Sequence, residues 1–204
     1  SKWRVEPGLI SGGQIVIEPD LSNAGPFLAA AMVTGSTVRI PNWPTETTQV
    51  GKQYIDLLSR MGAEVSLSDG TLTLKGSGVI IGIEVDLSEA GELTPTIAAL
   101  ATLASSPSRL TGIKHLRGHE TDRIAALAKE INRVGAKAVE LEDGLEITPG
   151  DLKPAKWLSY HDHRMATAGA IVGLRVPGLE VENIQTTSKT MPGFEHIWQK
   201  MLDS

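Results

Sequence analysis

The chain has 204 residues, a formal net charge of −5 and no cysteine. The lack of cysteine excludes a disulfide framework and thiol chemistry. The sequence has no lysine-arginine cluster of the kind that binds nucleic acid. It also has no apolar run that reaches the roughly 18 residues of a membrane span. We therefore expect a cytoplasmic enzyme lobe that binds neither membranes nor nucleic acid.

The chain repeats a folding unit. The segment Asp20–Gly25 returns as Asp86–Gly91, and each copy leads into an alanine-rich apolar stretch. Further on, Arg60–Ala63 matches Arg133–Ala136, and in both units an Asp-Gly pair between alternating segments predicts a hairpin. The order indicated is strand, helix, strand, helix, hairpin. The expected elements are helices at 27–33 and 97–104, strands at 36–40 and 108–113, and hairpin turns at Asp69-Gly70 and Asp143-Gly144.

A third and incomplete unit begins at Ser159–Asp162. The pattern predicts a helix reaching Leu174, a strand at 179–184 and a last helix at 194–202, without a closing hairpin. We therefore expect an α/β lobe of three units, at about 14–80, 81–150 and 151–204, with residues 1–13 outside the lobe.

Two helix starts carry arginines. The stretch Arg117–Arg123 enters a helix whose apolar residues recur at three- and four-residue steps, namely Ile124, Leu127, Ile131 and Val134. Asp162–Ala166 enters a second apolar helix. A cation in the first turn of a helix costs about 0.3–1 kcal/mol unless an anion lies beside it. Arg123 and Arg164 therefore indicate an anionic ligand held between helix N-termini.

The alternative is that these charges are solvated surface and that Asp122 and Asp162 only complement or cap helices. The first unit offers an internal comparison, because Glu46–Val50 takes the place of His119–Arg123 and Pro26 that of Glu92. The two units share glycines and apolar positions but not these charges. Since the first unit starts its helix without them, we favour a functional role.

Three segments resemble those of a known family. Arg117–Arg123, Asp162–Ala166 and Thr187–Pro192 are similar in order and spacing to signature segments of the 5-enolpyruvylshikimate-3-phosphate synthase family, as is the segment around Glu92. The resemblance covers essentially the whole chain but only the C-terminal half of that enzyme. It implies one of two lobes of the enolpyruvyl transferase fold, an inside-out α/β barrel. Residues 1–13 resemble the hinge and the tail of the N-terminal lobe, the missing partner whose first segment completes this lobe and accounts for the absent hairpin.

The resemblance implies transfer of the enolpyruvyl group from phosphoenolpyruvate to the 5-hydroxyl of shikimate 3-phosphate. Phosphate is released and no cofactor is needed; the step belongs to the shikimate pathway to aromatic amino acids. Guanidinium groups hold carboxylate and phosphate through paired hydrogen bonds. By family match, the residues that bind phosphoenolpyruvate are Arg123, Arg164, Lys189 and His163.

The same resemblance assigns the proton transfers to two carboxylates. Glu92 is expected to accept a proton while contacting shikimate 3-phosphate, and Glu120 to act at the methylene carbon of phosphoenolpyruvate. His119 and His115 are expected to contact shikimate 3-phosphate as well. Many family members carry aspartate at the position of Glu92 and lysine at that of His119, which changes the reach of the first and makes the charge of the second depend on pH near neutrality.

No metal site is expected. The pairs His115/His119 and His161/His163 do not fit a zinc motif. Two other functions stay open: the sister enzyme that uses UDP-N-acetylglucosamine on the same fold, and a non-catalytic binding or folding module. Because a single lobe provides half of the cleft, we expect no turnover from this chain alone.

Overall fold

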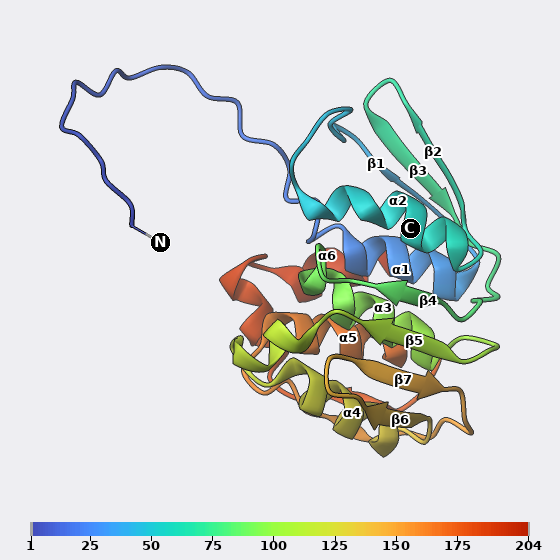
Figure 1. Cartoon of the computed structure of the whole chain (residues 1–204). Helices are drawn as coiled ribbons and strands as arrows, with labels where there is room; N and C mark the ends of the chain where they lie inside the picture. Colours follow the sequence, from blue (N-terminus) through green and yellow to red (C-terminus); the bar gives the residue numbers. More distant parts are fainter. Residues whose placement is uncertain (1, 204) are drawn as a thin grey trace.

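The computed structural model describes residues 2–203, and the three repeated units are visible in the order of its elements (Figure 1). The helices are α1 (Gly25–Thr34), α2 (Tyr54–Arg60), α3 (Thr94–Thr102), α4 (Arg123–Arg133), α5 (His163–Gly173) and α6 (Phe194–Leu202). The strands are β1 (Thr37–Ile40), β2 (Glu64–Ser68), β3 (Thr71–Lys75), β4 (Glu84–Asp86), β5 (Ser108–Thr111), β6 (Lys137–Glu140), β7 (Leu145–Thr148), β8 (Lys156–Trp157) and β9 (Glu180–Val181).

The strands form separate small sheets. The first has the order β1-β3-β2 and is antiparallel throughout. The second has the order β4-β5-β7-β6, in which β4 and β5 are parallel and the other pairs antiparallel. The third is the parallel pair β8-β9. Each sheet belongs to one repeated unit, and the described residues form no closed barrel.

The core lies where the helices of the three units meet. Helix α3 contacts α1, α4 and α5, and α1 also contacts α5 (Figure 1). Helices α1 and α3 are rich in alanine and buried on nearly all sides, which is typical of helices inside a core. Helix α4 is amphipathic, and the predicted stripe Ile124, Leu127, Ile131 and Val134 is fully buried. The small side chains let the helix N-termini of different units come close together.

The first unit differs from the prediction at its start. Residues 2–19 form no helix or strand, and in Figure 1 this segment leads away from the body of the protein. In the second unit, the Leu87 N–H donates to the Thr111 carbonyl and continues the pairing of β4 with β5. In the first unit, the corresponding Leu21 N–H donates to the side chain of Gln49. Pro19 also stands where β4 has a valine, and proline cannot donate to a strand.

Two further predictions were wrong in detail. Strand β9 has two residues instead of the expected six, and the chain from Ile184 to Lys189 is a 3-10 helix. The predicted tight turn at Asp143-Gly144 is a four-residue connection closed by a hydrogen bond from the Leu141 N–H to the Gly144 carbonyl. The turn at Asp69-Gly70 is as predicted, with positive φ at both residues. No helix among the described residues is both long and apolar enough to cross a membrane.

Candidate active site

The starts of α4 and α5 are joined by a buried ion pair. Arg123 Nε donates to Asp162 Oδ2 at 2.7 Å, and a second guanidinium nitrogen lies 3.3 Å from Oδ1. The two side chains are 3% and 0% exposed. The anion that the position of Arg123 requires is therefore supplied by the protein itself.

Both helix starts are capped by aspartates, as their sequence positions suggested. Asp122 accepts from the Ala125 N–H at 3.0 Å, and Asp162 accepts from the Arg164 N–H at 2.8 Å. Burial raises the pKa of Asp162, but its hydrogen bonds to Arg123 and the charge of that arginine outweigh burial and hold the pKa below its usual value. Capping and ion pairing thus fix the direction in which α5 presents its first residues.

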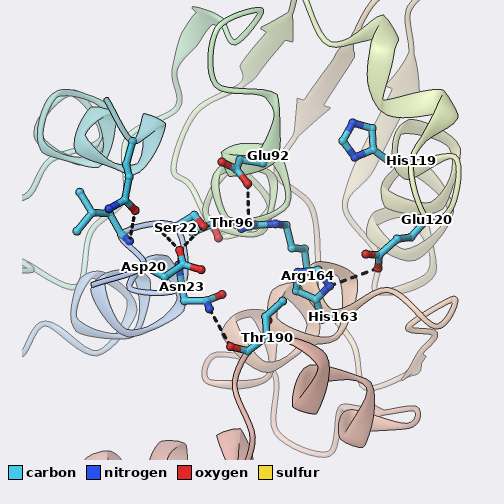
Figure 2. Close-up of polar contacts among 12 residues, drawn as sticks. Asp20, Ser22, Asn23, Glu92, Thr96, His119, Glu120, His163, Arg164 and Thr190 are labelled. Carbon is cyan, nitrogen blue, oxygen red and sulfur yellow. Dashed lines mark hydrogen bonds and ion pairs between the residues drawn. The ribbon is translucent and has the colours of Figure 1, made fainter. Parts of the chain in front are cut away.

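Arg164 reaches from the first turn of α5 to a carboxylate of the second unit. Its Nη2 donates to Glu92 Oε2 at 2.7 Å and to the Ser22 hydroxyl at 3.0 Å (Figure 2). Ser22 in turn donates to Asp20 at 2.6 Å. The predicted phosphoenolpyruvate ligand Arg164 and the predicted base Glu92 therefore form one contact, to which the first unit adds a hydroxyl.

Glu120 and His163 lie on the side of Arg164 away from Glu92 (Figure 2). Glu120 accepts from Lys189 and lies 3.3 Å from His163 Nδ1. Partial burial and the nearby Asp162 raise the pKa of Glu120, but the hydrogen bond from Lys189 and the positive charges nearby outweigh them, so the pKa is lowered. Burial, followed by the charge of Arg164, lowers the pKa of His163. The free protein therefore holds an ionised Glu120 beside a neutral His163 at neutral pH.

His119 and His115 form the exposed edge of the same region. Their rings are 6.0 Å apart, and His119 Nδ1 lies 3.5 Å from a guanidinium nitrogen of Arg123. Burial, Arg123 and His115 together lower the pKa of His119. The charge expected of His119 near neutrality is therefore shifted towards the neutral form. His115 packs against Gly91, where a Cβ would lie 2.2 Å from its ring nitrogen.

Glu120, Asp162 and His163 place potential ligand atoms within 4.8 Å of one another, close enough to hold a cation. The acceptor atoms are already engaged: Asp162 binds Arg123 and the start of α5, and Glu120 binds Lys189 and His163. We interpret the group as an ion-pair network, and the absence of a metal from the working protein stays a prediction.

The structure adds residues that the sequence reasoning did not select. Ser22 contacts Arg164 from the first unit and donates to Asp20, and Asn23 donates to the Thr190 carbonyl next to Lys189 at 3.2 Å. Their segment had been noticed only because it recurs as Asp86–Gly91. The sequence analysis gave the serine no role, although in the first copy it contacts Arg164.

The fold of this chain is shared with a class of enolpyruvyl-transfer enzymes. A structure of EPSP synthase from Acinetobacter baumannii superimposes with a TM-score of 0.78 at 25% identity, covering 95% of this chain and 49% of that one. The enolpyruvyl transferase NikO from Streptomyces tendae shares the fold, with a TM-score of 0.70 at 17% identity over 92% of this chain and 44% of its own.

A model of the EPSP synthase (3-phosphoshikimate 1-carboxyvinyltransferase) family matches residues 1–198. The 3-phosphoshikimate 1-carboxyvinyltransferase of Kocuria rhizophila is 56% identical over 202 residues, which are 99% of this chain and 45% of that protein. The chain belongs to the EPSP synthase family, as the sequence predicted. It spans about half the length of the curated relative that it matches.

Proposed function

We propose that this chain supplies one side of an active site that transfers the enolpyruvyl group from phosphoenolpyruvate to the 5-hydroxyl of shikimate 3-phosphate. Phosphate is the second product. Because the matched relatives are about twice as long, the proposal concerns this chain together with the remainder of such a protein, the N-terminal lobe.

One observation supports the proposal above all: the predicted substrate-binding cations are paired with the predicted acids. Arg164 contacts Glu92, and Lys189 contacts Glu120. An anionic substrate can replace the carboxylates as partner of Arg164 and Lys189, which frees those carboxylates for proton transfer. Arg123, paired with the buried Asp162, has its remaining amino group directed towards His119.

The balanced reaction assigns a task to each acid. In the addition, the substrate hydroxyl oxygen bonds to C2 of phosphoenolpyruvate, Glu92 takes the hydroxyl proton, and C3 gains a proton. In the elimination, the C2–O bond to phosphate breaks and C3 loses a proton. Because the pKa of Glu120 is lowered, this residue is ionised at neutral pH and can take the C3 proton in the elimination. The Lys189 ammonium bonded to it can supply a proton for the addition.

The test is phosphate release from phosphoenolpyruvate by this chain mixed with the part of the Kocuria rhizophila relative that it does not cover. Shikimate 3-phosphate and UDP-N-acetylglucosamine are supplied in separate runs. Release with shikimate 3-phosphate alone supports the proposal, and release with UDP-N-acetylglucosamine alone establishes the sister reaction instead. If the two parts associate but release no phosphate with either acceptor, the result would favour a non-catalytic binding or folding module.

A second measurement examines the individual assignment of Arg123. Replacing it with lysine keeps the charge but removes the planar fork, so the Michaelis constant for phosphoenolpyruvate is expected to rise. An unchanged constant would contradict the assignment.

A further inference from the structure

An unusual backbone conformation directly precedes the residues that carry the proposed function. Tyr160 and His161 both have positive φ, at 55° and 57°. The Asp162 N–H donates to the Ser159 carbonyl at 2.9 Å, which closes a four-residue turn around them. Turns with two positive φ values ordinarily use asparagine and glycine, because a side chain such as tyrosine is strained there. Such a conformation persists when surrounding contacts hold it, and strain of this kind is concentrated at functional sites.

The contacts that hold this turn converge on one carboxylate of α4. The Tyr160 hydroxyl donates to Glu130 Oε1 at 2.6 Å, and the Leu158 N–H donates to Oε2 at 3.1 Å. Arg133, one turn along α4, lies 2.9 Å from the same carboxylate and balances its charge. Glu130 itself is 0% exposed. A buried carboxylate with three partners can hold a neighbouring segment firmly in place.

The repeated units show that the scaffold does not require this acid. When Arg60–Ala63 is aligned with Arg133–Ala136, Glu130 corresponds to Leu57. Leu57 is a core residue, 2% exposed, on α2. The first unit fills the position with a side chain that needs no partner. The second unit fills it with a charge, and the partners of that charge lie in the turn before Asp162.

We propose that Glu130 is a positioning residue: by binding Tyr160 and the Leu158 N–H, it fixes the turn that presents His163 and Arg164 to substrate. The inference rests on the proposed function as far as the substrate is concerned. The same helix also holds Asp162 through Arg123. Helix α4 therefore contacts the segment 158–164 at two points, through Arg123 at its start and through Glu130 near its end.

The experiment has one arm that needs no turnover. Tyr160→Phe removes a single hydroxyl, and Glu130→Gln keeps the shape but removes the charge. In the chain alone, NMR would follow the titration of the His163 ring and the Nε–H signal of Arg164. Both variants are expected to move both signals. Asn132→Ala is the matched control: it loses side-chain hydrogen bonds on the same helix, but these bonds join α4 to β6.

The second arm uses the chain completed by the remainder of the relative. A displaced Arg164 is expected to lower kcat/KM for phosphoenolpyruvate by about tenfold to a hundredfold, mainly through KM. Asn132→Ala is expected to lower the melting temperature while leaving KM unchanged. If Tyr160→Phe and Glu130→Gln destabilise the chain but leave the His163 and Arg164 signals in place, Glu130 is structural and the proposal is overturned. If the signals move but the completed wild-type protein has no turnover, the positioning role stands and the proposed function fails.

Discussion

The starts of α2 and α4 occupy corresponding places in the first and second units, but the start of α4 carries the buried charge of Arg123 where the first unit has Val50. In the first unit, the chain enters through a short 3-10 helix, Val50–Gln53, whose N-cap Gln49 makes no side-chain cap bond. In the second unit, α4 runs unbroken from Arg123 and is capped by Asp122. Gln49 instead donates to the Pro19 carbonyl and accepts from the Leu21 N–H, and so holds the incoming chain.

The difference separates what the fold needs from what the site needs. Both units bury an apolar helix face and close with a hairpin. The second unit alone carries Arg123 and Glu130 at positions that the first fills with Val50 and Leu57. Buried charges are costly unless they are paired, so the paired charges of the second unit support the role proposed for that unit in the site.

The largest expected effect is on turnover, and it comes from replacing Glu120, the acid just before α4. Glu120→Gln in the completed protein is expected to lower turnover by about 10²–10⁴-fold, because a general acid–base group contributes that much to rate. The measurement is phosphate release at saturating substrates. Thr47→Ala, at the corresponding position of the first unit, is the matched control and is expected to leave turnover unchanged. A loss below about tenfold for Glu120→Gln would count against its role.

Breaking the buried ion pair between Arg123 and Asp162 compares the stability of the two helix starts. Arg123→Leu leaves Asp162 buried without its partner and is expected to cost about 3–5 kcal/mol of unfolding free energy. Val50→Ala, at the corresponding position, is expected to cost about 1 kcal/mol. Both are measured by urea denaturation of the chain. Adding Asp162→Asn to Arg123→Leu should recover part of the loss, since asparagine still caps a helix but carries no charge. No recovery would mean that packing, and not the unpaired charge, causes the loss.

Local sequence patterns predicted what depends on neighbours along the chain. The stripe on α4, the cap by Asp162 and the turn at Asp69-Gly70 each follow from a few adjacent residues, and the structure has all three. The arginines at two helix starts also predicted that these helix N-termini lie close together, and Arg123 does contact Asp162.

What the patterns missed depends on contacts across the chain. The sequence pointed to an external anion beside Arg123, but the nearest anion is Asp162, 39 residues away. Ser22 contacts Arg164, which is 142 residues away in the sequence, and Tyr160 contacts Glu130, which is 30 residues away. No periodicity links such pairs, because tertiary packing alone decides which buried polar groups become partners.

A smaller effect distinguishes the two hairpins. Gly70 has a φ of +66°, and an added Cβ would meet only ordinary contact at 3.8 Å, so Gly70→Ala should cost about 1 kcal/mol through backbone strain. Gly144 has no such φ, but a Cβ there would lie 2.0 Å from the Leu110 carbonyl oxygen. Gly144→Ala must therefore displace β5 or its own loop, and it should cost more than Gly70→Ala in denaturant unfolding. The reverse order would show that the second hairpin can move away from β5.

The smallest expected effect is a change in how steeply the free energy of unfolding depends on pH. The pKa of His163 is lowered in the folded protein, by burial first and then by Arg164. The unfolded chain therefore binds this proton more readily, and unfolding free energy falls as pH drops below about 6.5 and through the folded pKa. His163→Gln should flatten that fall between about pH 7.5 and 5.5, a range above the ordinary titration of carboxylates. His119, whose pKa is also lowered but whose ring is more exposed, should give a weaker flattening when replaced by glutamine. If both variants keep the wild-type slope, the pKa of His163 is not lowered in the folded protein, and the ionised Glu120 must offset burial and the charge of Arg164.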